Sequence, residues 1–333
     1  MKVFIITEGN SKIGFGHISR CISLSQAFNE RNIDPFFIIN GGETIKSLIN
    51  PQNLFLFDWL KENNKLYNLI NEADIAIIDS YSFSDLIAKK ISQIVKLSVF
   101  IDDNNRINYP KGIVINSSIH AKNLKYLNNP EISYLLGTEY SMLRKIFWEP
   151  STKDIGKQIE TILLTVGMND IRNLIPKLLK ILNEKFPNFK KKVIVGKYFQ
   201  NIDKIDYFQN KNCNLLFSPD ANEMKKAMLS SDIAITAGGQ TSYELISLGV
   251  PPIIITVADN QVQSVEELSK LGVAYYAGWW ENKDLFKNIL SFIDNLKNIE
   301  VRQKIIKKGQ KYIKPDGSRK IINTIIKQFK KEK

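Results

Sequence analysis

The chain has 333 residues, of which 44% are hydrophobic and 2 are cysteines, and its formal net charge is +12. At about 150 residues per domain, this length predicts two domains, each large enough to bury its own core. Two cysteines far apart in the sequence argue against a disulfide or cysteine metal framework, and no apolar run reaches the ~18 residues of a membrane span. Because the sequence also starts directly with a strand-like run, we expect a cytoplasmic globular protein without stable membrane insertion.

The positive charge alone is compatible with nucleic acid, an anionic membrane or an anionic small ligand as partner. The densest basic runs lie at residues 185–192 and 327–333, and no pattern of a known nucleic-acid-binding module accompanies them. We therefore expect no nucleic-acid partner. A solvated basic surface that attracts phosphorylated ligands is the simpler interpretation.

The first half of the chain alternates strand-like runs with helix-like segments. Residues 1–7 form the first run, and apolar residues at helical spacing follow from Ile18, so a helix is expected to begin near His17. Cys21 is expected in the core of that helix, and residues 85–94 form another amphipathic segment. The further runs expected to form strands in this half are 35–40, 53–57, 75–79, 97–102 and 112–116.

The second half repeats this plan after Pro150, with strand-like runs at 161–167, 191–196, 214–218, 233–236 and 251–256. Strands that alternate with helices predict a parallel sheet covered by helices, so the expected fold class is α/β, with two Rossmann-like parallel-sheet domains facing a cleft. We place these domains at 1–150 and 151–315, and expect residues 316–333 to form a terminal helix that packs back on the first domain. In such sheets ligands bind at the carboxyl ends of the strands.

His17 is one of only 2 histidines and stands at the first strand-to-helix junction, after Gly14 and Gly16. The glycines do not form a dinucleotide fingerprint, because Ser19 occupies the position of the third glycine and the residues EGNSK separate the strand from the turn. A histidine is suited to accept a proton near neutral pH. The alternative is a capping or packing histidine, whereas His120 is expected to be structural or peripheral.

Residues 235–278 carry the strongest signal of the second half. Gly238 and Gly239 follow a strand and let backbone amides approach an anion, while the next helix points its amino-terminal dipole at the same place. Glu244, one turn into that helix, is placed to accept hydrogen bonds from ribose hydroxyls. The alternative is a tight strand-to-helix turn with a solvated glutamate.

These motifs resemble known families. The series Gly-Gly-x-[Ser/Thr]-x-x-Glu, Gly-x-Pro and Asn-Gln resembles the nucleotide-sugar-binding half of glycosyltransferase-B fold proteins, including the peptidoglycan N-acetylglucosaminyltransferase. The segments IGFGHISRC, IIDSY, FIDDNNR, GTEYSMLR and DNQVQS are similar to the UDP-2,4-diacetamido-2,4,6-trideoxy-β-L-altropyranose hydrolases of pseudaminic acid biosynthesis. The resemblance covers nearly the whole chain. It implies the glycosyltransferase-B fold and hydrolysis of a UDP-linked 2,4-diacetamido-2,4,6-trideoxyhexose to UDP and free sugar, with inversion at the anomeric carbon.

The resemblance implies that His17 is the catalytic base and that Tyr81 and Asn260 line the sugar site. We expect no cofactor and no metal, because isolated histidines and scattered carboxylates lack ligand spacing. A small-molecule UDP-sugar is the expected partner, and a monomer the expected state. The substrate-binding residues are predicted to be Gly14, Gly16, Arg20, Tyr81, Asp102, Asn260 and Gln261, and the UDP-binding residues Gly167, Ser218, Gly238, Gly239, Gln240, Thr241 and Glu244.

One departure from the family, the role of two carboxylates and two functional alternatives stay open. Met168 stands where the family has a second glycine, which predicts restricted backbone approach near Gly167. Asp102 and Asp103 are candidates for sugar binding, for an alternative base or for loop capping. A glycosyltransferase of the same fold, with the amphipathic tail helping a basic surface to meet a membrane, is one alternative. A non-catalytic nucleotide-sugar-binding protein is the other.

Overall fold

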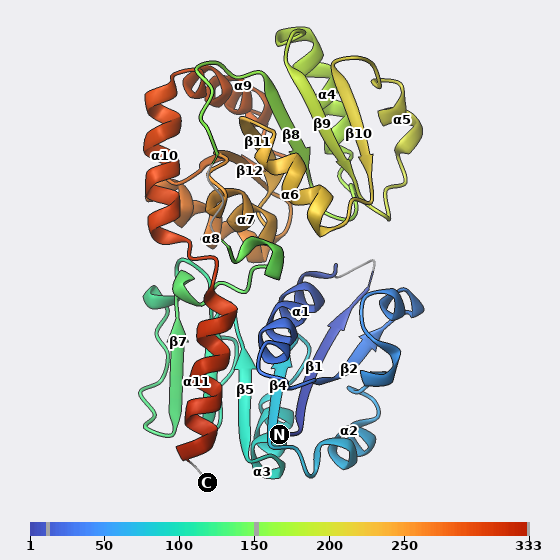
Figure 1. Ribbon diagram of the computed structural model, residues 1–333, viewed down its shortest axis with the longest axis vertical. Helices are drawn as coiled ribbons and strands as arrows, with labels where there is room; N and C mark the ends of the chain where they lie inside the picture. Colours follow the sequence, from blue (N-terminus) through green and yellow to red (C-terminus); the bar gives the residue numbers. More distant parts are fainter. Residues whose placement is uncertain (11–13, 150–152, 332–333) are drawn as a thin grey trace. The chain divides into compact units, whose positions relative to one another are not determined.

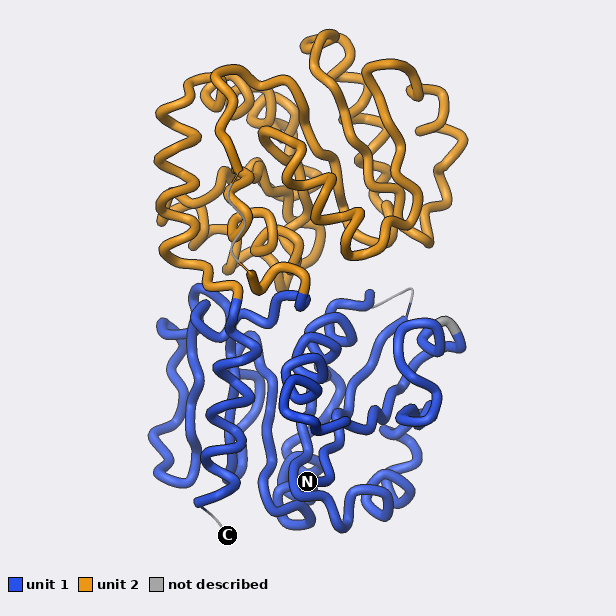
Figure 2. Tube along the Cα trace, in the orientation of Figure 1, with its two compact units in different colours: residues 1–145, 316–333 blue, residues 146–315 orange. Residues whose placement is uncertain are grey.

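The computed structural model describes residues 1–10, 14–149 and 153–331. The chain divides into two compact units, coloured separately in Figure 2. One unit is Met1–Lys145 with Asp316–Lys333, and the other is Ile146–Pro315. The division therefore falls a few residues before the predicted boundary at 150, which itself lies outside the described residues.

The first unit is built on a parallel sheet, which among the described residues has seven strands in the order β3-β2-β1-β4-β5-β6-β7 (Figure 1). Parallel pairing brings the carboxyl ends of these strands to one edge, and the register places Thr7 of β1 beside Asp79 of β4. The strands are β1 (Val3–Gly9), β2 (Phe36–Gly41), β3 (Leu54–Leu56), β4 (Ile75–Asp79), β5 (Leu97–Ile101), β6 (Gly112–Asn116) and β7 (Ile132–Leu136).

Helices cover this sheet, and the last of them comes from the far end of the sequence. The helices are α1 (Gly16–Asn29), α2 (Asn63–Ile70), α3 (Asp85–Ile94) and α11 (Gly317–Lys331), with short 3-10 turns η1 (Glu43–Ser47), η2 (Pro51–Asn53), η3 (Ala121–Asn123) and η4 (Thr138–Tyr140). A further 3-10 turn, η5 (Lys145–Phe147), spans the point where the first unit ends and the second begins. The hydroxyls of Ser318 in α11 and Ser23 in α1 lie 2.7 Å apart. Arg319 donates to both carboxylate oxygens of Glu30 at 2.8 and 2.9 Å, so α11 is fastened to α1 by polar as well as apolar contacts.

The second unit has a parallel sheet of six strands within the described ranges, in the order β10-β9-β8-β11-β12-β13. These strands are β8 (Thr161–Thr165), β9 (Lys190–Val195), β10 (Cys213–Phe217), β11 (Ile233–Ala237), β12 (Pro252–Thr256) and β13 (Tyr275–Trp279). The helices are α4 (Leu174–Lys185), α5 (Ile202–Asp206), α6 (Ala221–Leu229), α7 (Gln240–Ser247), α8 (Asp259–Lys270), α9 (Leu285–Leu296) and α10 (Ile299–Tyr312).

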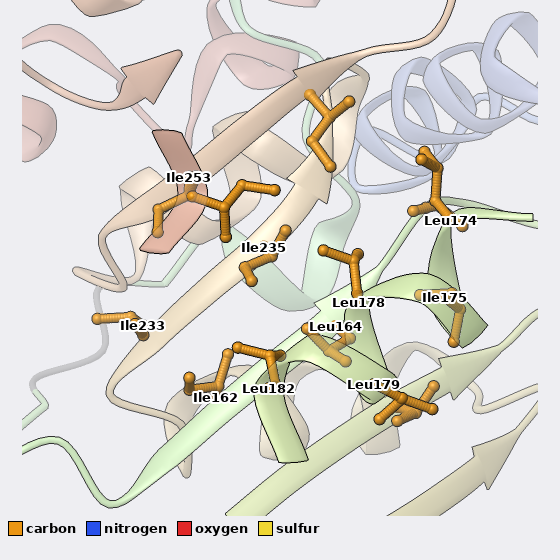
Figure 3. Close-up of a cluster of buried hydrophobic side chains, with 14 of the residues drawn as sticks. Ile162, Leu164, Leu174, Ile175, Leu178, Leu179, Leu182, Ile233, Ile235 and Ile253 are labelled. Atoms are coloured by element: carbon orange, nitrogen blue, oxygen red, sulfur yellow. The ribbon is translucent and has the colours of Figure 1, made fainter. Parts of the chain in front are cut away.

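Figure 3 shows how α4 covers one face of the second sheet. Leu178 and Leu182 of α4 are fully buried and belong to the same apolar cluster as Ile162 of β8 and Ile235 of β11. Leucines that recur at helical spacing put one side of α4 on the sheet, and burying each side chain contributes about 1.5–3 kcal/mol. The cluster holds the sheet rigid below the loops at its carboxyl edge.

The predicted fold class, α/β with two parallel-sheet domains, is confirmed, but the sequence patterns miss two strands. Both β7 and β13 are edge strands in which buried residues are mixed with half-buried ones. Ser133 interrupts the apolar residues of β7, and Gly278 those of β13. In addition, β13 pairs with β12 through a register shift between Ile254 and Ile255. Among the described residues, no helix has both the length and the apolar character needed to cross a membrane.

Candidate active site

His17 lies in the first turn of α1 and is 8% exposed. The turn that leads into this helix passes through Gly14, whose φ of +84° lies in the left-handed region, and the Gly14 N–H donates to the Asn10 carbonyl at 2.9 Å. A Cβ built at Gly16 would meet open space. The two predicted glycines thus border the start of α1 and bring His17 to the carboxyl edge of the first sheet.

Asp79 ends β4, the strand beside β1, and its fully buried carboxylate is the partner of His17. The Nδ1 atom of His17 lies 2.7 Å from Asp79 Oδ1. Arg20, one helical turn after His17, donates from Nε to Asp79 Oδ2 and from Nη2 to Asp79 Oδ1, both at 2.6 Å. This bidentate contact fixes the orientation of the Asp79 carboxylate relative to the imidazole.

Asp103 and Tyr81 extend the network. Arg20 donates from Nη1 to the two oxygens of Asp103 at 2.8 and 3.0 Å. The hydroxyl of Tyr81 donates to the same carboxylate. The Tyr81 ring stands edge-on to the His17 ring, with 4.5 Å between centroids and 84° between planes. Five side chains, from α1, from the end of β4 and from the loops after β4 and β5, therefore form one connected cluster.

The charges of this cluster assign the proton on His17. Burial alone would raise the pKa of Asp79, but the charges of Arg20 and His17 and their hydrogen bonds outweigh it and hold that pKa well below its usual range. Burial likewise opposes ionisation of Asp103, and Arg20 lowers the pKa of Asp103 in spite of it. An ionised carboxylate can only accept, so the 2.7 Å contact requires a hydrogen on His17 Nδ1. Arg20 Nη2 also lies 3.1 Å from Nδ1, but it donates to Asp79 Oδ1 at the shorter distance of 2.6 Å. In neutral His17 the lone pair is then on Nε2.

Cys21, predicted as a helix core residue, is fully buried in α1. Burial and the neighbouring Asp79 raise the pKa of this thiol well above its usual value. It remains a neutral thiol and donates weakly to Asp79 Oδ2 at 3.5 Å. Cys21 is therefore a further hydrogen-bond donor to Asp79 and not a nucleophile.

Asp102 does not join the cluster, although it was predicted to bind substrate. Its carboxylate is 1% exposed and accepts from the backbone N–H of Asn105 at 2.7 Å, from that of Asn104 at 3.3 Å and from the Tyr126 hydroxyl at 2.6 Å. These contacts are those of a loop cap, one of the roles that the sequence left open. The neighbouring Asp103 is the carboxylate that reaches Arg20.

The glycine turn of the second unit lies between β11 and α7. Gly238 donates its N–H to the Ile255 carbonyl at 3.0 Å, and a Cβ at this position would lie 2.7 Å from Val265 Cγ2. Gly239 is the N-cap of α7, and a Cβ here would meet open space. Gln240 and Thr241 follow in the first helical turn, half-buried. The amino-terminal end of α7 therefore brings its partial positive charge to the carboxyl edge of the second sheet.

Glu244 is only 2% exposed within α7, so the alternative of a solvated glutamate is wrong. Gln261 of α8 is half-buried, and its Oε1 accepts from the Val257 N–H at 3.0 Å, whereas Asn260 is exposed. Ser218 is exposed directly after β10, with a φ of +44°. These predicted residues come from separate loops at the carboxyl edge of the second sheet. The loops approach closely at one point, since a Cβ built on Gly238 would lie 3.1 Å from Gln261 Cβ.

Met168 follows Gly167 in the loop after β8 and is 38% exposed. Gly167 has a φ of +97°, and a Cβ built on it would meet open space. The close approach in this region is at Gly196, where a Cβ would lie 2.5 Å from the backbone of Met168. The Met168 carbonyl also accepts from the Tyr198 N–H at 3.0 Å. The loop after β8 is therefore held against the loop after β9 through the Met168 backbone.

Of the two acidic partners of Arg20, Asp103 was a candidate from the sequence, whereas Asp79 is absent from the predicted site residues. Asp79 ends a run that was predicted as a strand, and it shares the sheet edge with His17, which was the available signal. No group of three or more His, Cys, Asp or Glu side chains is arranged to hold a metal ion among the described residues.

Comparison with known sequences adds three relatives. The chain is 24% identical over 277 residues to the UDP-2,4-diacetamido-2,4,6-trideoxy-beta-L-altropyranose hydrolase of Campylobacter jejuni, across 82% of this chain and 97% of that protein. A Helicobacter pylori protein named pseudaminic acid cytidylyltransferase and UDP-2,4-diacetamido-2,4,6-trideoxy-beta-L-altropyranose hydrolase is 23% identical over 280 residues, across 82% of this chain and 48% of its own length. An uncharacterized protein of Methanocaldococcus jannaschii is 28% identical over 285 residues, across 81% of this chain and 58% of its own length. The chain thus spans about half the length of the last two relatives.

Solved structures and one domain family identify the architecture. MurG of Acinetobacter baumannii has a TM-score of 0.68 at 13% identity, covering 98% of this chain and 100% of that chain. The S. aureus MnaA co-structure with UDP has a TM-score of 0.68 at 14% identity, covering 99% and 97%. Residues 161–315 match the family described as glycosyltransferase family 28 C-terminal domain. The chain therefore has the glycosyltransferase-B fold.

Proposed function

We propose that this chain hydrolyses a UDP-linked sugar to UDP and free sugar. A water molecule attacks the anomeric carbon, the bond from that carbon to the diphosphate oxygen breaks, and UDP leaves with the electron pair. The proton of the attacking water passes to Nε2 of His17. Because this is one displacement, the configuration at the anomeric carbon inverts.

The observation that carries the proposal is the contact of His17 with Asp79. A base must present a lone pair in a fixed direction, and the 2.7 Å contact at Nδ1 gives Nε2 that role. Arg20 donates to both oxygens of the Asp79 carboxylate, which keeps it ionised. A protein that only binds a nucleotide sugar has no need of an oriented imidazole, and this argues against the non-catalytic alternative.

We assign the UDP moiety to the second unit. Its diphosphate would accept hydrogen bonds from backbone N–H groups at the start of α7, where the helix dipole favours negative charge. Glu244 would accept from the ribose hydroxyls. The other UDP contacts are proposed to be Gly167, Ser218, Gly238, Gly239, Gln240 and Thr241, and those to the sugar Gly14, Gly16, Tyr81, Asn260 and Gln261.

The names of two relatives support a particular sugar. Both the Campylobacter jejuni and the Helicobacter pylori proteins are named as hydrolases of UDP-2,4-diacetamido-2,4,6-trideoxy-beta-L-altropyranose. We therefore propose a 2,4-diacetamido-2,4,6-trideoxyhexose as the sugar of this chain. Pseudaminic acid biosynthesis is the corresponding proposal for its pathway.

A glycosyltransferase is the second candidate, and the match of residues 161–315 to a glycosyltransferase family favours it. In that reaction an acceptor hydroxyl takes the place of water, while His17 receives its proton in the same way. The two reactions differ in their dependence on an acceptor. A hydrolase turns over at full rate without one, whereas a transferase is slow until the acceptor is added.

The test is incubation of the purified chain with the diacetamido-trideoxy UDP-sugar and with UDP-N-acetylglucosamine, without acceptor. Phosphorus NMR follows UDP release, and proton NMR assigns the anomer of the fresh product. We expect rapid release from the first substrate and an inverted free sugar. General base catalysis is worth about 10² to 10⁴ in rate, so His17→Asn should slow turnover by that factor and leave UDP affinity unchanged.

His120→Asn is the matched control, because it removes the other of the 2 histidines from the same unit. It should keep wild-type turnover. A product that retains its anomeric configuration, or near wild-type hydrolysis by His17→Asn, contradicts the single displacement. Slow hydrolysis that an acceptor accelerates strongly would favour the transferase.

A further inference from the structure

Tyr81 belongs to a short loop, residues 80–82. One buried carboxylate accepts hydrogen bonds from the N–H and hydroxyl groups of this loop. Glu8, near the carboxyl end of β1, is 5% exposed. Its Oε1 accepts from the Ser80 hydroxyl at 2.6 Å and from the Tyr81 N–H at 3.0 Å. The Ser82 hydroxyl lies 3.0 Å from Oε1 and 2.9 Å from Oε2. Glu8 therefore receives a hydrogen bond from each residue of the loop.

Arg106 donates hydrogen bonds to two backbone carbonyls of the same loop. It donates from Nη2 to the Ser80 carbonyl at 2.8 Å and from Nη1 to the Tyr81 carbonyl at 3.0 Å. Its guanidinium also lies 5.0 Å from the centre of the Phe83 ring. Side chains thus supply the hydrogen bonds that regular secondary structure would give to this backbone. The conformation of the loop depends on Glu8 and Arg106 together.

We propose that Glu8 is a positioning residue for His17, acting through Tyr81; this rests on the proposed role of His17 as the base. The Tyr81 ring confines the imidazole on one side, edge-on at 4.5 Å, while Asp79 holds Nδ1. The position of that ring follows from the loop backbone, which Glu8 fixes at the Tyr81 N–H itself. Loss of the carboxylate releases the loop, and the imidazole then gains orientations that do not face the substrate.

The contacts of Glu8 predict which substitution is tolerated. All three donors lie within hydrogen-bond distance of Oε1, so a glutamine oxygen at that position preserves the three bonds. The glutamine amide would then face Ser82 Oγ, which can accept. Glu8→Gln is therefore the conservative variant and Glu8→Ala the disruptive one. Arg106→Lys is a second disruptive variant, because an ammonium lacks the fork that bridges two carbonyls.

The first test is NMR of the imidazoles in the whole chain, which needs no substrate. With 2 histidines in the sequence, His120→Asn assigns both sets of signals. The edge-on Tyr81 ring shifts the carbon-bound protons of His17, and Tyr81→Leu removes that shift. We expect Glu8→Ala to move these signals toward the Tyr81→Leu values, and Glu8→Gln to keep them. His120 signals and the melting temperature report whether the fold is intact.

The second test is kinetic. Glu8→Ala should lower kcat about 10- to 100-fold, the effect of a displaced catalytic group, with KM changed less than about twofold. In the Tyr81→Leu background it should add less than about twofold, because both variants act through one ring. Unchanged His17 signals in folded Glu8→Ala overturn the proposal, and so do additive effects on kcat. If Glu8→Ala does not fold, the same comparison is made with Arg106→Lys. A wild-type chain that hydrolyses no UDP-sugar overturns the proposed function, while the NMR comparison still decides on Glu8.

Discussion

The carboxyl edges of the two sheets differ in what they offer to a ligand. The edge of the first unit presents ionised side chains joined in one network around Asp79, whereas the edge of the second presents a glycine turn and the start of α7. Side chains can hold a proton at a chosen atom, and backbone amides can surround an anion. The carboxyl edge of the first sheet is therefore suited to a chemical step, and the carboxyl edge of the second sheet is suited to nucleotide binding. Changes at one edge should affect rate, and changes at the other should affect affinity.

The largest expected effect comes from Asp79→Asn. The amide no longer requires a hydrogen on His17 Nδ1, so the imidazole loses both its tautomer and its orientation. We expect turnover to fall by about 10² to 10⁴, the contribution of general base catalysis, with UDP affinity unchanged. Asp74→Asn is the matched control, because Asp74 is an ion-paired carboxylate just before β4, at the opposite edge, 2.7 Å from Lys96. Equal losses of turnover in the two variants contradict the role of Asp79.

The two units should also respond in opposite ways to acid. The folded pKa of Asp79 is depressed, so its contribution to stability is complete above the unfolded pKa near 4 and is lost as pH falls toward the folded value. In the second unit, burial raises the pKa of Asp170 despite the hydrogen bonds it accepts. Its contribution therefore grows more favourable as pH falls.

Hydrogen exchange in urea at pH 7, 5, 4 and 3.5 separates these effects, with intrinsic exchange rates corrected for pH. Peptides from β4 report the first unit and peptides from β8 the second. The loss of local stability in Asp79→Asn should be on the order of 2–3 kcal/mol at pH 7 and shrink toward pH 3.5. The difference between wild type and Asp170→Asn should change in the opposite direction. Parallel changes in both units argue against this assignment.

A smaller effect is expected from Glu244→Ala. Loss of a charged acceptor for ribose hydroxyls costs about 1.5 kcal/mol, which raises the Kd for UDP roughly tenfold. Calorimetry with 2′-deoxy-UDP sharpens the test. The deoxy ligand should bind wild type more weakly than UDP does, and the two ligands should bind Glu244→Ala about equally. Wild-type affinity for UDP in Glu244→Ala removes this residue from the ribose site.

The smallest expected effect is that of a chelator. If amides at the start of α7 and Gly239 carry the diphosphate charge, turnover in excess EDTA should equal turnover without it. Rates are compared before and after prolonged dialysis against EDTA. A loss of turnover that Mg²⁺ restores would show that an ion, rather than backbone, balances this charge.

The central elements of both sheets follow from the sequence because burial on two faces leaves a continuous apolar run. The predicted strands 75–79 and 112–116 and the predicted helix 85–94 coincide with β4, β6 and α3. The edge strands β3 and β10 were also predicted, from the runs 53–57 and 214–218, but the edge strands β7 and β13 were missed. Three of the five residues of β13 are only partly buried, and its Gly278, with a φ of +119°, looks like a turn residue in the sequence.

Individual residues of the candidate active site could be predicted from the sequence, but the contacts that join them into a network could not. His17, Arg20 and Tyr81 were predicted from the junction of the first strand and from a resemblance. Asp79 lies 62 positions from His17, and the two meet because β1 pairs with β4 rather than with β3. Strand order depends on how helices cross the sheet, which local patterns do not encode. Glu8 and Arg106 were missed for the same reason.

The return of the chain to the first unit sets an order of events during synthesis. Ile321, Ile322, Ile325 and Phe329 of α11 are buried, and this helix packs on α1. The ribosome makes α11 only after every residue of Ile146–Pro315. A nascent chain therefore carries an incompletely covered α1 while the second unit can already fold. The unit that begins first along the chain is the one completed last.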